Sequence, residues 1–435
     1  MKVLGLDIGT TTVSAVVVEE RQVLASRTLK NESFLPTEKP WEKIQDPKVI
    51  LRTALRAVTE LLTEHPDVQR IGVTGQMHGI VYLNGMGEPV SPLYIWQDGR
   101  GDLPYREGTT YASYIRSATG YPVATGYGLV THFHHLKNGL VPGDAASFCT
   151  IHDYAAMILA GRTVPVTEAS DAASFGLFDV AKGCFDETAL KSLGIDEKLL
   201  PKLAEKSCIG YYQGKIPVFV AIGDNQASFL GASGGDVDCM LVNVGTGSQF
   251  SVYSKAYMCC AGLETRPFPG GGYLLVGASL CGGRAYALLE SCIRDIVARV
   301  GGLQMESCYS AMDRLLDSAP KPSDLPQTQP LFQGTRENPQ LRGAVSGLST
   351  ENFTVTHMIW SMLEGMAREL HDMYLVYAQQ GGTCKKLIGS GNGLRKNIHL
   401  QRCFGEKFEQ EPVMSLCTEE AATGAALYAA MSPVL

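Results

Sequence analysis

Two short glycine–threonine turns, far apart in the chain, carry the residue types that bind phosphate. The first is Asp7-Ile8-Gly9-Thr10-Thr11-Thr12, and the second is Gly245-Thr246-Gly247-Ser248. Each follows an apolar run that predicts a strand, and each leads directly into another predicted strand. Such a turn presents backbone N–H groups and hydroxyls to one point, which suits phosphate oxygens. Either turn alone also fits an ordinary glycine hairpin, but the pair together favours a nucleotide enzyme.

A carboxylate stands between the two turns, where a predicted strand runs into a helix. Asp224 follows the apolar segment 216–222. Phosphoryl transfer to a hydroxyl needs a group that aligns the nucleophile and accepts its proton, and a carboxylate held at a strand end can do this. The alternative is that Asp224 only caps the helix. Asp7, at the mouth of the first turn, is a candidate to orient Mg²⁺ together with Asp224, and a turn-forming role is its alternative.

Hydrophobic periodicity predicts the elements that must position these residues. A helix is expected over 47–64, with Asp46 as its cap and Pro47 in its first turn. Three strands precede it, and one follows, at 2–8, 13–19, 23–28 and 68–74. This meander followed by a helix and a strand is typical of the opening of a ribonuclease-H-like half, not of a Rossmann domain.

The second half repeats this plan around the second glycine turn. Its further helices are expected over 283–300, 354–379 and 395–408, with a strand at 386–388. The chain has 435 residues, which exceeds one comfortable core. We therefore expect two domains, 1–210 and 211–435, with a hinge at 210–214. Ligands often bind in the cleft between two such halves.

Composition excludes several classes of function. The net charge of −7 argues against nucleic acid or an anionic membrane as a partner. The sequence shows neither a leader nor an apolar stretch long enough to span a bilayer. The 12 cysteines lie from Cys149 onward without metal-binding spacing, which is typical of reduced thiols in a cytoplasmic protein.

With these motifs the chain resembles a carbohydrate kinase of the FGGY family, within the actin–hexokinase–Hsp70 fold, over nearly its whole length. The resemblance implies an α/β protein of two ribonuclease-H-like domains with an interdomain cleft. It also implies ATP and Mg²⁺ as cofactors, and Asp224 as the catalytic base. The family has a run of three glycines that contacts adenine, and here the corresponding segment is Gly391-Asn392-Gly393. Asn397 corresponds to a purine-contacting asparagine on the first turn of the next helix.

Three segments resemble the sugar-contacting parts of the family. Gln76-Met77-His78 ends a strand, as the ketose-contacting turn of xylulokinases does, although a histidine there also fits a structural role. Trp96-Gln97-Asp98-Gly99-Arg100 matches a Trp-x-Asp-x-Arg segment, in which Asp98 can accept hydrogen bonds from two hydroxyls of a polyol. Asn225-Gln226, next to the expected base, can donate and accept toward the same sugar.

Two other groups of residues are weaker candidates. His132, His134 and His135 are crowded, but no nearby cysteine or acid gives them metal-binding spacing, which favours a structural cluster. Gly283 begins a helix whose N-terminus can bind nucleotide phosphate. Close packing of that helix on a sheet is an equal alternative.

Within the family, several segments resemble sedoheptulokinases more than xylulokinases or glycerol kinases. These segments are 126–138, 150–154, 171–174 and 223–228. Glycerol kinases carry an Arg-Glu pair where this chain has Met77-His78. The resemblance therefore implies ATP-dependent phosphorylation of a ketose, with sedoheptulose forming its 7-phosphate. Xylulose or another pentulose is the alternative substrate.

Two alternatives belong to other classes of protein. One is a non-catalytic sugar-binding or nucleotide-binding member of the fold, and the other is a chaperone-like ATPase. Retention of both Asp7 and Asp224 argues against the first, and the sugar-type segments argue against the second. The expected partner is a small-molecule ketose, and a homodimer is left open as the assembly.

Overall fold

In the computed structural model, which describes residues 1–106, 108–335, 338 and 340–434, the first apolar run forms the inner strand of a sheet. This strand, β1 (Val3–Ile8), pairs antiparallel with β2 (Thr12–Glu19). On its other side it pairs parallel with β5 (Arg70–Gly75). Since β1 has a neighbour on each edge and is mostly buried, its near-continuous apolar sequence is expected. β3 (Gln22–Lys30) pairs with β2 and completes the predicted meander, which is confirmed.

The remaining strands of this sheet come from a later part of the chain. β16 (Ile216–Phe219) and β17 (Ile222–Gly223) both pair parallel with β5, and β15 (Cys208–Tyr212) pairs antiparallel with β16. Among the described residues, the sheet has the order β15-β16-β5-β1-β2-β3, with β17 also on β5. The parallel set β1, β5 and β17 therefore runs side by side through the sheet.

Helix α1 (Pro47–Glu64) has the predicted bounds and the predicted cap. The Asp46 carboxylate accepts hydrogen bonds from the backbone N–H groups of Lys48 and Val49, at 2.8 and 3.3 Å, and Pro47 occupies the first turn. Its apolar stripe packs on β1, β2 and β3. The helix thus begins where local sequence favours it, and tertiary packing buries its face.

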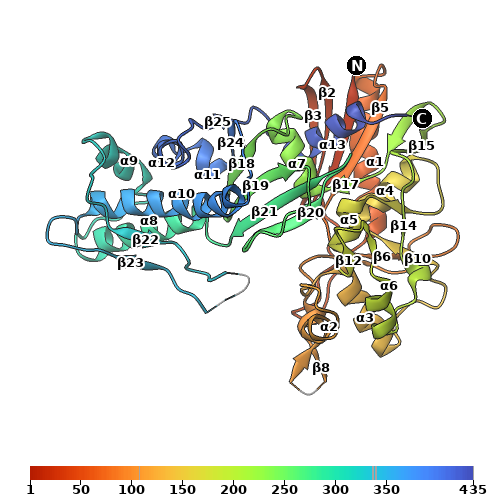
Figure 1. The fold of residues 1–435 in the computed structure, drawn as a ribbon. Helices are drawn as coiled ribbons and strands as arrows, with labels where there is room; N and C mark the ends of the chain where they lie inside the picture. The colour runs from red at the N-terminus through yellow and green to blue at the C-terminus, as the bar shows by residue number, and fades with distance from the viewer. Residues whose placement is uncertain (107, 336–337, 339, 435) are drawn as a thin grey trace. The chain divides into compact units, whose positions relative to one another are not determined.

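Two further helices lie against opposite faces of β5. A side chain at Gly72 would overlap the carbonyl oxygen of Ala425 in α13 (Glu420–Met431), whereas one at Gly75 would meet the Cβ of His152 in α4 (Ile151–Leu159). Residues 72 and 75 are an odd number apart, so they point to opposite faces of the strand. Figure 1 shows α13, near the end of the chain, beside β5, near its beginning, and α13 also contacts β1.

Helices α7 (Asp224–Ser233) and α13 cross at backbone contact. A Cβ atom at Gly424 would overlap the carbonyl oxygen of Ala227, and one at Gly231 would overlap that of Glu420. No side chain larger than hydrogen fits at either crossing point. These glycines set how closely α7 approaches the sheet-covering helix.

The middle of the first unit folds into smaller elements around a core of their own. Its core includes Tyr82, Phe133, Phe148 and Phe175. The helices, including two short 3₁₀ turns, are η1 (Gly99–Asp102), α2 (Tyr111–Thr119), α3 (Gly128–Asn138), α5 (Ala169–Ser174), α6 (Glu187–Leu193) and η2 (Glu197–Leu199). The strands are β4 (Ile44–Gln45), β6 (Val81–Leu83), β7 (Leu93–Tyr94), β8 (Pro104–Arg106), β9 (Thr109–Thr110), β10 (Ser147–Cys149), β11 (Val166–Thr167), β12 (Phe178–Asp179), β13 (Cys184–Phe185) and β14 (Lys202–Leu203).

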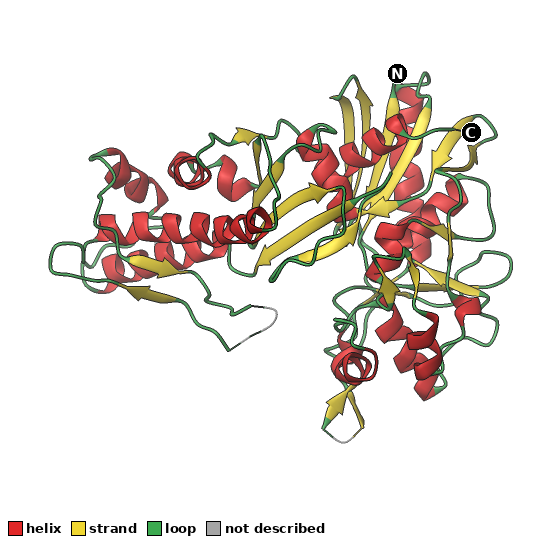
Figure 2. Cartoon of the chain, in the orientation of Figure 1, coloured by secondary structure: helices red, strands yellow, loops and turns green. Residues whose placement is uncertain are grey.

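The second unit is built on another mixed sheet, with the order β20-β21-β19-β18-β24-β25 among the described residues. Figure 2 shows two long helices, α8 and α10, running beside each other. Trp360 on α10 is one of the largest fully buried side chains of this unit's core. The strands are β18 (Met240–Val244), β19 (Ser248–Ser254), β20 (Glu264–Pro267), β21 (Tyr273–Ser279), β22 (Gln327–Gln329), β23 (Ala344–Ser346), β24 (Leu387–Ser390) and β25 (Val413–Met414). The helices are α8 (Gly283–Arg299), α9 (Tyr309–Asp317), α10 (Val355–Gln379), α11 (Asn392–Arg395) and α12 (Ile398–Phe408).

One predicted helix is divided. The segment 395–408 was expected to be continuous, but α11 ends at Arg395 and α12 begins at Ile398. Asn397 separates them as the N-cap of α12, its side chain accepting a hydrogen bond from the N–H of Leu400 at 2.9 Å. An asparagine side chain that satisfies a free N–H group favours a new helix start over continuation of the old one.

The compact units differ from the predicted domains 1–210 and 211–435. The first unit comprises Met1–Asp236, Arg266–Tyr273 and Cys417–Leu435, and the second comprises Val237–Thr265 and Leu274–Leu416. The predicted boundary falls inside the first unit because β16 and β17 belong to its sheet and because α7 and α13 pack on that sheet. Within the described part of the chain, every helix is too short or too polar to cross a membrane.

We predict that Gly424→Ala destabilises the first unit, because the added methyl group must displace the backbone at Ala227. Overpacking of this kind costs about 1–3 kcal/mol or more. Thermal unfolding followed by circular dichroism should show a lower transition temperature. Gly143→Ala is the control, because a Cβ there meets nothing within 4 Å. Equal transition temperatures for the two variants would contradict the close helix crossing.

Candidate active site

Three parallel strands end in one row at the same edge of the first sheet. Ile8 of β1 pairs with Gly75 of β5, which in turn pairs with Gly223 of β17. The next residues along each strand are therefore the first glycine–threonine turn, the Gln76-Met77-His78 segment and Asp224. The sequence indicated these three segments through separate motifs, and the structure places the residues that precede them, Ile8, Gly75 and Gly223, side by side. Ligands of α/β proteins commonly bind at the carboxyl ends of parallel strands.

The backbone before Asp224 is held by Ser170 of the short helix α5, a residue that no motif indicated. The N–H of Gly223 donates to the hydroxyl of Ser170 in α5, at 3.0 Å. Gly223 is the N-cap of α7, and Asp224 is the first residue of the helix. The helix-capping alternative for Asp224 is therefore not supported. Its half-buried carboxylate accepts instead from the side-chain amide of Asn225, at 2.6 Å.

The carboxylates at this edge are destabilised in their charged forms. Burial raises the pKa of Asp224, although Asn225, Arg266 and His152 partly oppose that shift. Burial and the charge of Asp224 raise the pKa of Asp7 to about 7. The two carboxyl groups thus interact with one another. A carboxyl whose pKa lies nearer neutrality accepts a proton more readily than an ordinary aspartate does.

A second layer of ionisable groups is buried behind Asp224. His152 and Asp171 have no exposed surface, and the histidine Nε2 lies 2.8 Å from an Asp171 carboxylate oxygen. Burial raises the pKa of Asp171 and lowers that of His152. Burial, with the charge of Asp171, also raises the pKa of Asp153 to about 8. These residues lie in segments 150–154 and 171–174, which were noted only for their resemblance to sedoheptulokinases, and that resemblance did not indicate a buried cluster of charges.

His78 adopts a strained backbone that α5 also stabilises. Its φ of 72° lies in the left-handed region, which non-glycine residues rarely occupy and which is often kept at functional sites. Its N–H donates to the Ser174 hydroxyl at 3.1 Å, and its Nδ1 lies 2.7 Å from the Ser174 carbonyl oxygen. Because a carbonyl only accepts, Nδ1 carries the hydrogen, and Nε2 of the neutral ring is an acceptor.

Tyr127 is a neighbour of His78 that the sequence analysis did not select. The two rings stack with their centroids 4.5 Å apart. Tyr127 and Ser174 both lie in segments that were noted only for their resemblance to sedoheptulokinases. That resemblance was the available signal, but it did not distinguish these residues from their neighbours.

The two amides that follow Asp224 point in different directions. Asn225 is half-buried, and its Nδ2 lies 3.8 Å from the sulfur of Met77, itself buried beside it. Gln226 is fully buried and donates to the carbonyl oxygen of Pro267 at 2.8 Å. The expectation that Gln226 contacts a sugar conflicts with this arrangement, whereas Asn225 stays a candidate.

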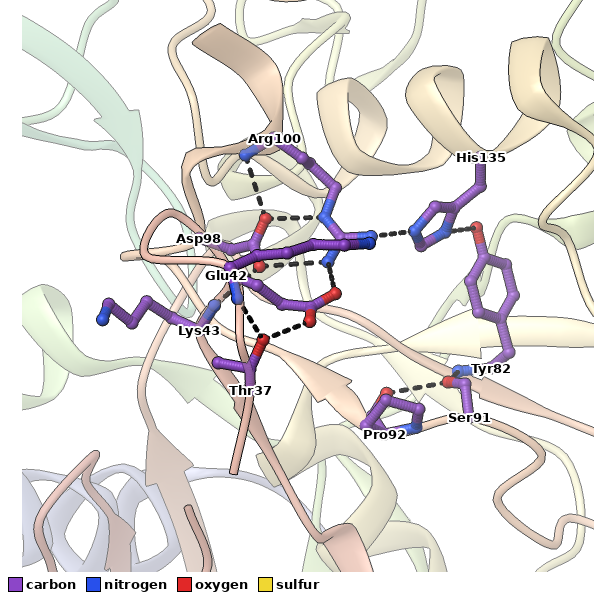
Figure 3. Close-up of polar contacts among 10 residues, drawn as sticks. Thr37, Glu42, Lys43, Tyr82, Ser91, Pro92, Asp98, Arg100 and His135 are labelled. Atoms are coloured by element: carbon purple, nitrogen blue, oxygen red, sulfur yellow. Dashed lines mark hydrogen bonds and ion pairs between the residues drawn. The ribbon is translucent and has the colours of Figure 1, made fainter. Parts of the chain in front are cut away.

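Asp98 belongs to a buried charge cluster, which Figure 3 shows. Its two carboxylate oxygens accept from Nε and Nη2 of Arg100, at 2.6 and 3.0 Å, and from the backbone N–H groups of Arg100 and Lys43. The Arg100 guanidinium also contacts Glu42 and the ring of His135. The expectation that Asp98 accepts from sugar hydroxyls conflicts with this arrangement, because each oxygen already accepts two hydrogen bonds.

The histidine cluster is structural, as the spacing indicated. His132 and His135 both lie within hydrogen-bond distance of the Tyr82 hydroxyl, at 2.8 and 3.1 Å. Burial lowers the pKa of His132 and of His134 to about 4. Burial, with the charge of Arg100, lowers the pKa of His135 as well. All three histidines are therefore neutral at pH 7, and all three are buried residues of α3.

The first glycine–threonine turn is anchored from within the same unit. Asn31 donates to the Gly9 carbonyl oxygen at 2.9 Å, and the hydroxyl of Thr10 donates to Gln76 at 3.2 Å. Thr11 and Thr12 are exposed. The Thr10 hydroxyl hydrogen is thus used internally, which leaves backbone N–H groups and the next two hydroxyls to meet a ligand.

The second turn joins β18 to β19 and is supported by the start of α8. The N–H groups of Gly283 and Arg284 donate to the carbonyl oxygens of Gly245 and Thr246, at 2.8 and 3.1 Å. A Cβ at Gly282 would overlap the backbone of Gly247. These contacts favour the close-packing alternative for Gly283, whose N–H orients the turn. Thr246, at the tip, is exposed.

The predicted adenine segment connects β24 to α11. Gly391 has a φ of 84°, and a Cβ there would overlap the backbone of Val244, so glycine is required. A Cβ added at Gly393 would lie 2.8 Å from the carbonyl oxygen of the same residue. Asn392 is exposed at the start of the helix. Both glycines thus have a packing function, which leaves their contact with a nucleotide as a proposal.

Within the described residues, no group of three or more His, Cys, Asp and Glu side chains is arranged to hold a metal ion. Mg²⁺ in kinases commonly uses one or two carboxylates together with substrate phosphates and water. The interacting Asp7 and Asp224 oxygens suit that pattern, because a cation would relieve their mutual repulsion.

We predict that Asp153→Asn weakens the pH dependence of stability. Folded Asp153 holds its proton up to about pH 8, whereas an unfolded aspartate loses it near pH 4. Its contribution to stability is therefore lost as pH rises between these values. Urea denaturation should show the parent chain less stable at pH 9 than at pH 5, with a smaller difference in the variant. An unchanged difference would contradict the assignment, and exposed Asp144→Asn is the control.

The chain is similar in sequence and in fold to known carbohydrate kinases. Human and mouse sedoheptulokinases are each 29% identical to the chain, covering 98% and 93% of it and 96% and 94% of their own lengths. A solved xylulose kinase from Rhodospirillum rubrum has a TM-score of 0.82 at 22% identity, covering 99% of this chain and 90% of that one. The predicted two-domain actin–hexokinase fold is confirmed. Residues 2–237 match the N-terminal domain model of the FGGY carbohydrate kinases. The chain belongs to the FGGY family of carbohydrate kinases.

Proposed function

We propose that the chain transfers the γ-phosphoryl group of ATP to the terminal hydroxyl of a ketose, and that sedoheptulose is the preferred ketose. Membership of the kinase family gives ATP as the co-substrate. The observation that carries the proposal is the shared register of β1, β5 and β17. Because of this register, a phosphate-type turn, a sugar-type segment and a carboxylate all begin at one edge of the sheet. The similarity to two sedoheptulokinases supports the choice of sugar.

Asp224 is the catalytic base in this proposal. It accepts the proton of the attacking hydroxyl as the new O–P bond forms. Burial raises its pKa and so favours proton acceptance. The N–H of Gly223 donates a hydrogen bond to the Ser170 hydroxyl, and this bond fixes the backbone that carries the carboxylate. A base held rigidly near its target contributes through position as well as through basicity.

The sugar is bound by His78, Asn225 and Trp96. With Nδ1 committed to Ser174, His78 Nε2 accepts from one hydroxyl. Asn225 donates or accepts beside the base, and the half-exposed indole of Trp96 supports the carbon chain. A seven-carbon ketose offers more hydroxyls to such groups than a pentulose does. A site shaped for those hydroxyls rejects a shorter sugar, because its polar groups are then left unpaired.

The turn in each unit binds phosphate oxygens through backbone N–H groups, with exposed hydroxyls at Thr11, Thr12 and Thr246. Asn397 and the 391–393 segment contact the base and ribose of the nucleotide. Asp7 and Asp224 hold Mg²⁺, directly or through water. When bound, Mg²⁺ neutralises the charge that develops on the phosphate oxygens.

We also propose a cytoplasmic location. All 12 cysteines, each of them a described residue, are free thiols. Such an abundance of reduced thiols fits a reducing compartment.

The substrate is tested by comparing kcat/KM for sedoheptulose, D-xylulose and D-ribulose at one ATP concentration, with ADP release as the readout. We expect the highest value for sedoheptulose. A clear preference for either pentulose would reject the sugar and keep the kinase chemistry. Failure of every ketose to stimulate ADP release by folded protein would reject the proposed function itself.

Asp224→Asn should lower kcat by about 10²–10⁴-fold, because the amide keeps the side chain's size but cannot accept the proton. Calorimetry should still show binding of the sugar and of the nucleotide. The same change at exposed Asp196 is the control and should leave kcat unchanged. Lost sugar binding, with normal turnover of each complex that forms, would make Asp224 a binding residue instead.

A further inference from the structure

A closed ring of hydrogen bonds joins the first phosphate turn to the sugar-type segment. The Thr10 hydroxyl donates to Gln76 Oε1 at 3.2 Å. Gln76 Nε2 donates to Gln45 Oε1 at 2.9 Å, and Gln45 Nε2 donates to the Thr10 carbonyl oxygen at 2.8 Å. The ring therefore starts and ends on the same residue of the turn. Gln45, which no sequence motif indicated, has no exposed surface.

The ring permits one orientation of each amide. If the Gln45 amide were reversed, its NH₂ group would face that of Gln76 and its oxygen would face the Thr10 carbonyl oxygen. Both of those contacts are repulsive, and the burial of Gln45 and Gln76 excludes water that could relieve them. A fully satisfied buried network of this kind specifies a single arrangement. The Thr10 backbone is thus held in a defined position by Gln45.

Trp96 extends the ring to the surface on the sugar side. Its indole N–H donates to the Thr10 hydroxyl at 3.1 Å, and 46% of the side chain is exposed. The Thr10 hydroxyl therefore accepts from Trp96 while it donates to Gln76. A molecule that contacts the indole therefore contacts a group that is hydrogen-bonded to the phosphate turn.

The charge cluster of Figure 3 fixes the two strands that supply Gln45 and Trp96. Gln45 ends β4, which pairs with β7, and Trp96 follows β7 by two residues. The N–H of Lys43 donates to Asp98 at 2.9 Å, and its carbonyl oxygen accepts from Ile95 at 3.2 Å. The buried Asp98–Arg100 pair thus ties the backbone before Gln45 to the backbone around Trp96.

We propose that this ring couples the sugar side of the site to the phosphate turn, with Gln45 as a positioning residue, so that ketose and nucleotide bind cooperatively. The inference rests on the proposed function, since it needs a sugar at Trp96 and phosphate at the turn. The buried ring has one arrangement, but the half-exposed Trp96 indole is tied to it only through the Thr10 hydroxyl. A sugar that orders the indole therefore also orders that hydroxyl and the turn that carries it. The nucleotide then has fewer groups to order and binds more tightly.

The test measures the dissociation constant of Mg·AMP-PNP by calorimetry, without and with a saturating concentration of the ketose that the enzyme turns over. The ratio of the two constants is the coupling factor, which must be the same when the ligands are exchanged. For the parent chain we expect a factor of about 5 or more, within the usual range for coupled sites. A parent factor of 1 would overturn the proposal.

Gln45→Glu is the informative variant, because it keeps the acceptor for Gln76 and loses the donor to Thr10. We expect its coupling factor to fall to within about twofold of 1. Asn31→Asp is the matched control. It removes one N–H donated to a carbonyl of the same turn, that of Gly9, but Asn31 lies outside the ring. It should weaken nucleotide binding equally with and without sugar and so retain the coupling factor.

If Gln45→Glu does not fold, as judged by its circular dichroism and thermal transition, Thr10→Val and Thr10→Ser decide the question. Serine keeps the hydroxyl and should retain the coupling, whereas valine keeps the shape and should lose it. Equal coupling in the two would overturn the proposal. A parent chain that turns over no ketose would reject the proposed function and this inference with it. Normal turnover with coupling that survives Gln45→Glu would reject only the inference.

Discussion

The register between three parallel strands is the constraint on which the candidate active site depends. Because Ile8, Gly75 and Gly223 lie in one row, the residues that follow them start from the same edge of the sheet. Gly75 permits that alignment, since a Cβ there would lie 2.7 Å from the Ile8 carbonyl oxygen and would also press on His152. A shift of one residue in any of the three strands would move a turn, a histidine or a carboxylate away from the others.

Two buried layers of polar groups hold this edge, and they work by different means. On one side, α5 uses the serine hydroxyls of residues 170 and 174 to fix the backbones of Gly223 and His78. On the other side, the Asp98–Arg100 ion pair orders the strands around Trp96. A buried ion pair is favourable only when its remaining hydrogen bonds are satisfied, and here the Asp98 oxygens and the Arg100 guanidinium have partners.

The sequence was informative where function and structure depend on neighbouring residues. Asp46 and Pro47 define the start of α1, and strand–turn–strand patterns locate both glycine turns. The sequence was less informative where the direction of a side chain decides whether a residue can contact a ligand. Asn225 and Gln226 are adjacent and chemically alike, but successive helix positions point about 100° apart, so Asn225 faces Asp224 and Gln226 faces the interior. Gln45 and Ser170 could not be found, because their roles arise only from contacts with residues distant in the chain.

The crossing of α7 and α13 has a consequence for how the chain folds during synthesis. Helix α13 covers β1 and β5, yet residues 237–416, nearly all of which form the second unit apart from the short segment Arg266–Tyr273, lie between α7 and that helix in the chain. The ribosome must therefore release an entire second unit before the first sheet receives its covering helix. Until α13 is synthesised, the face of the sheet around Gly5 and Gly72 has no covering helix. The exposed apolar surface of such an intermediate is the kind that chaperones bind.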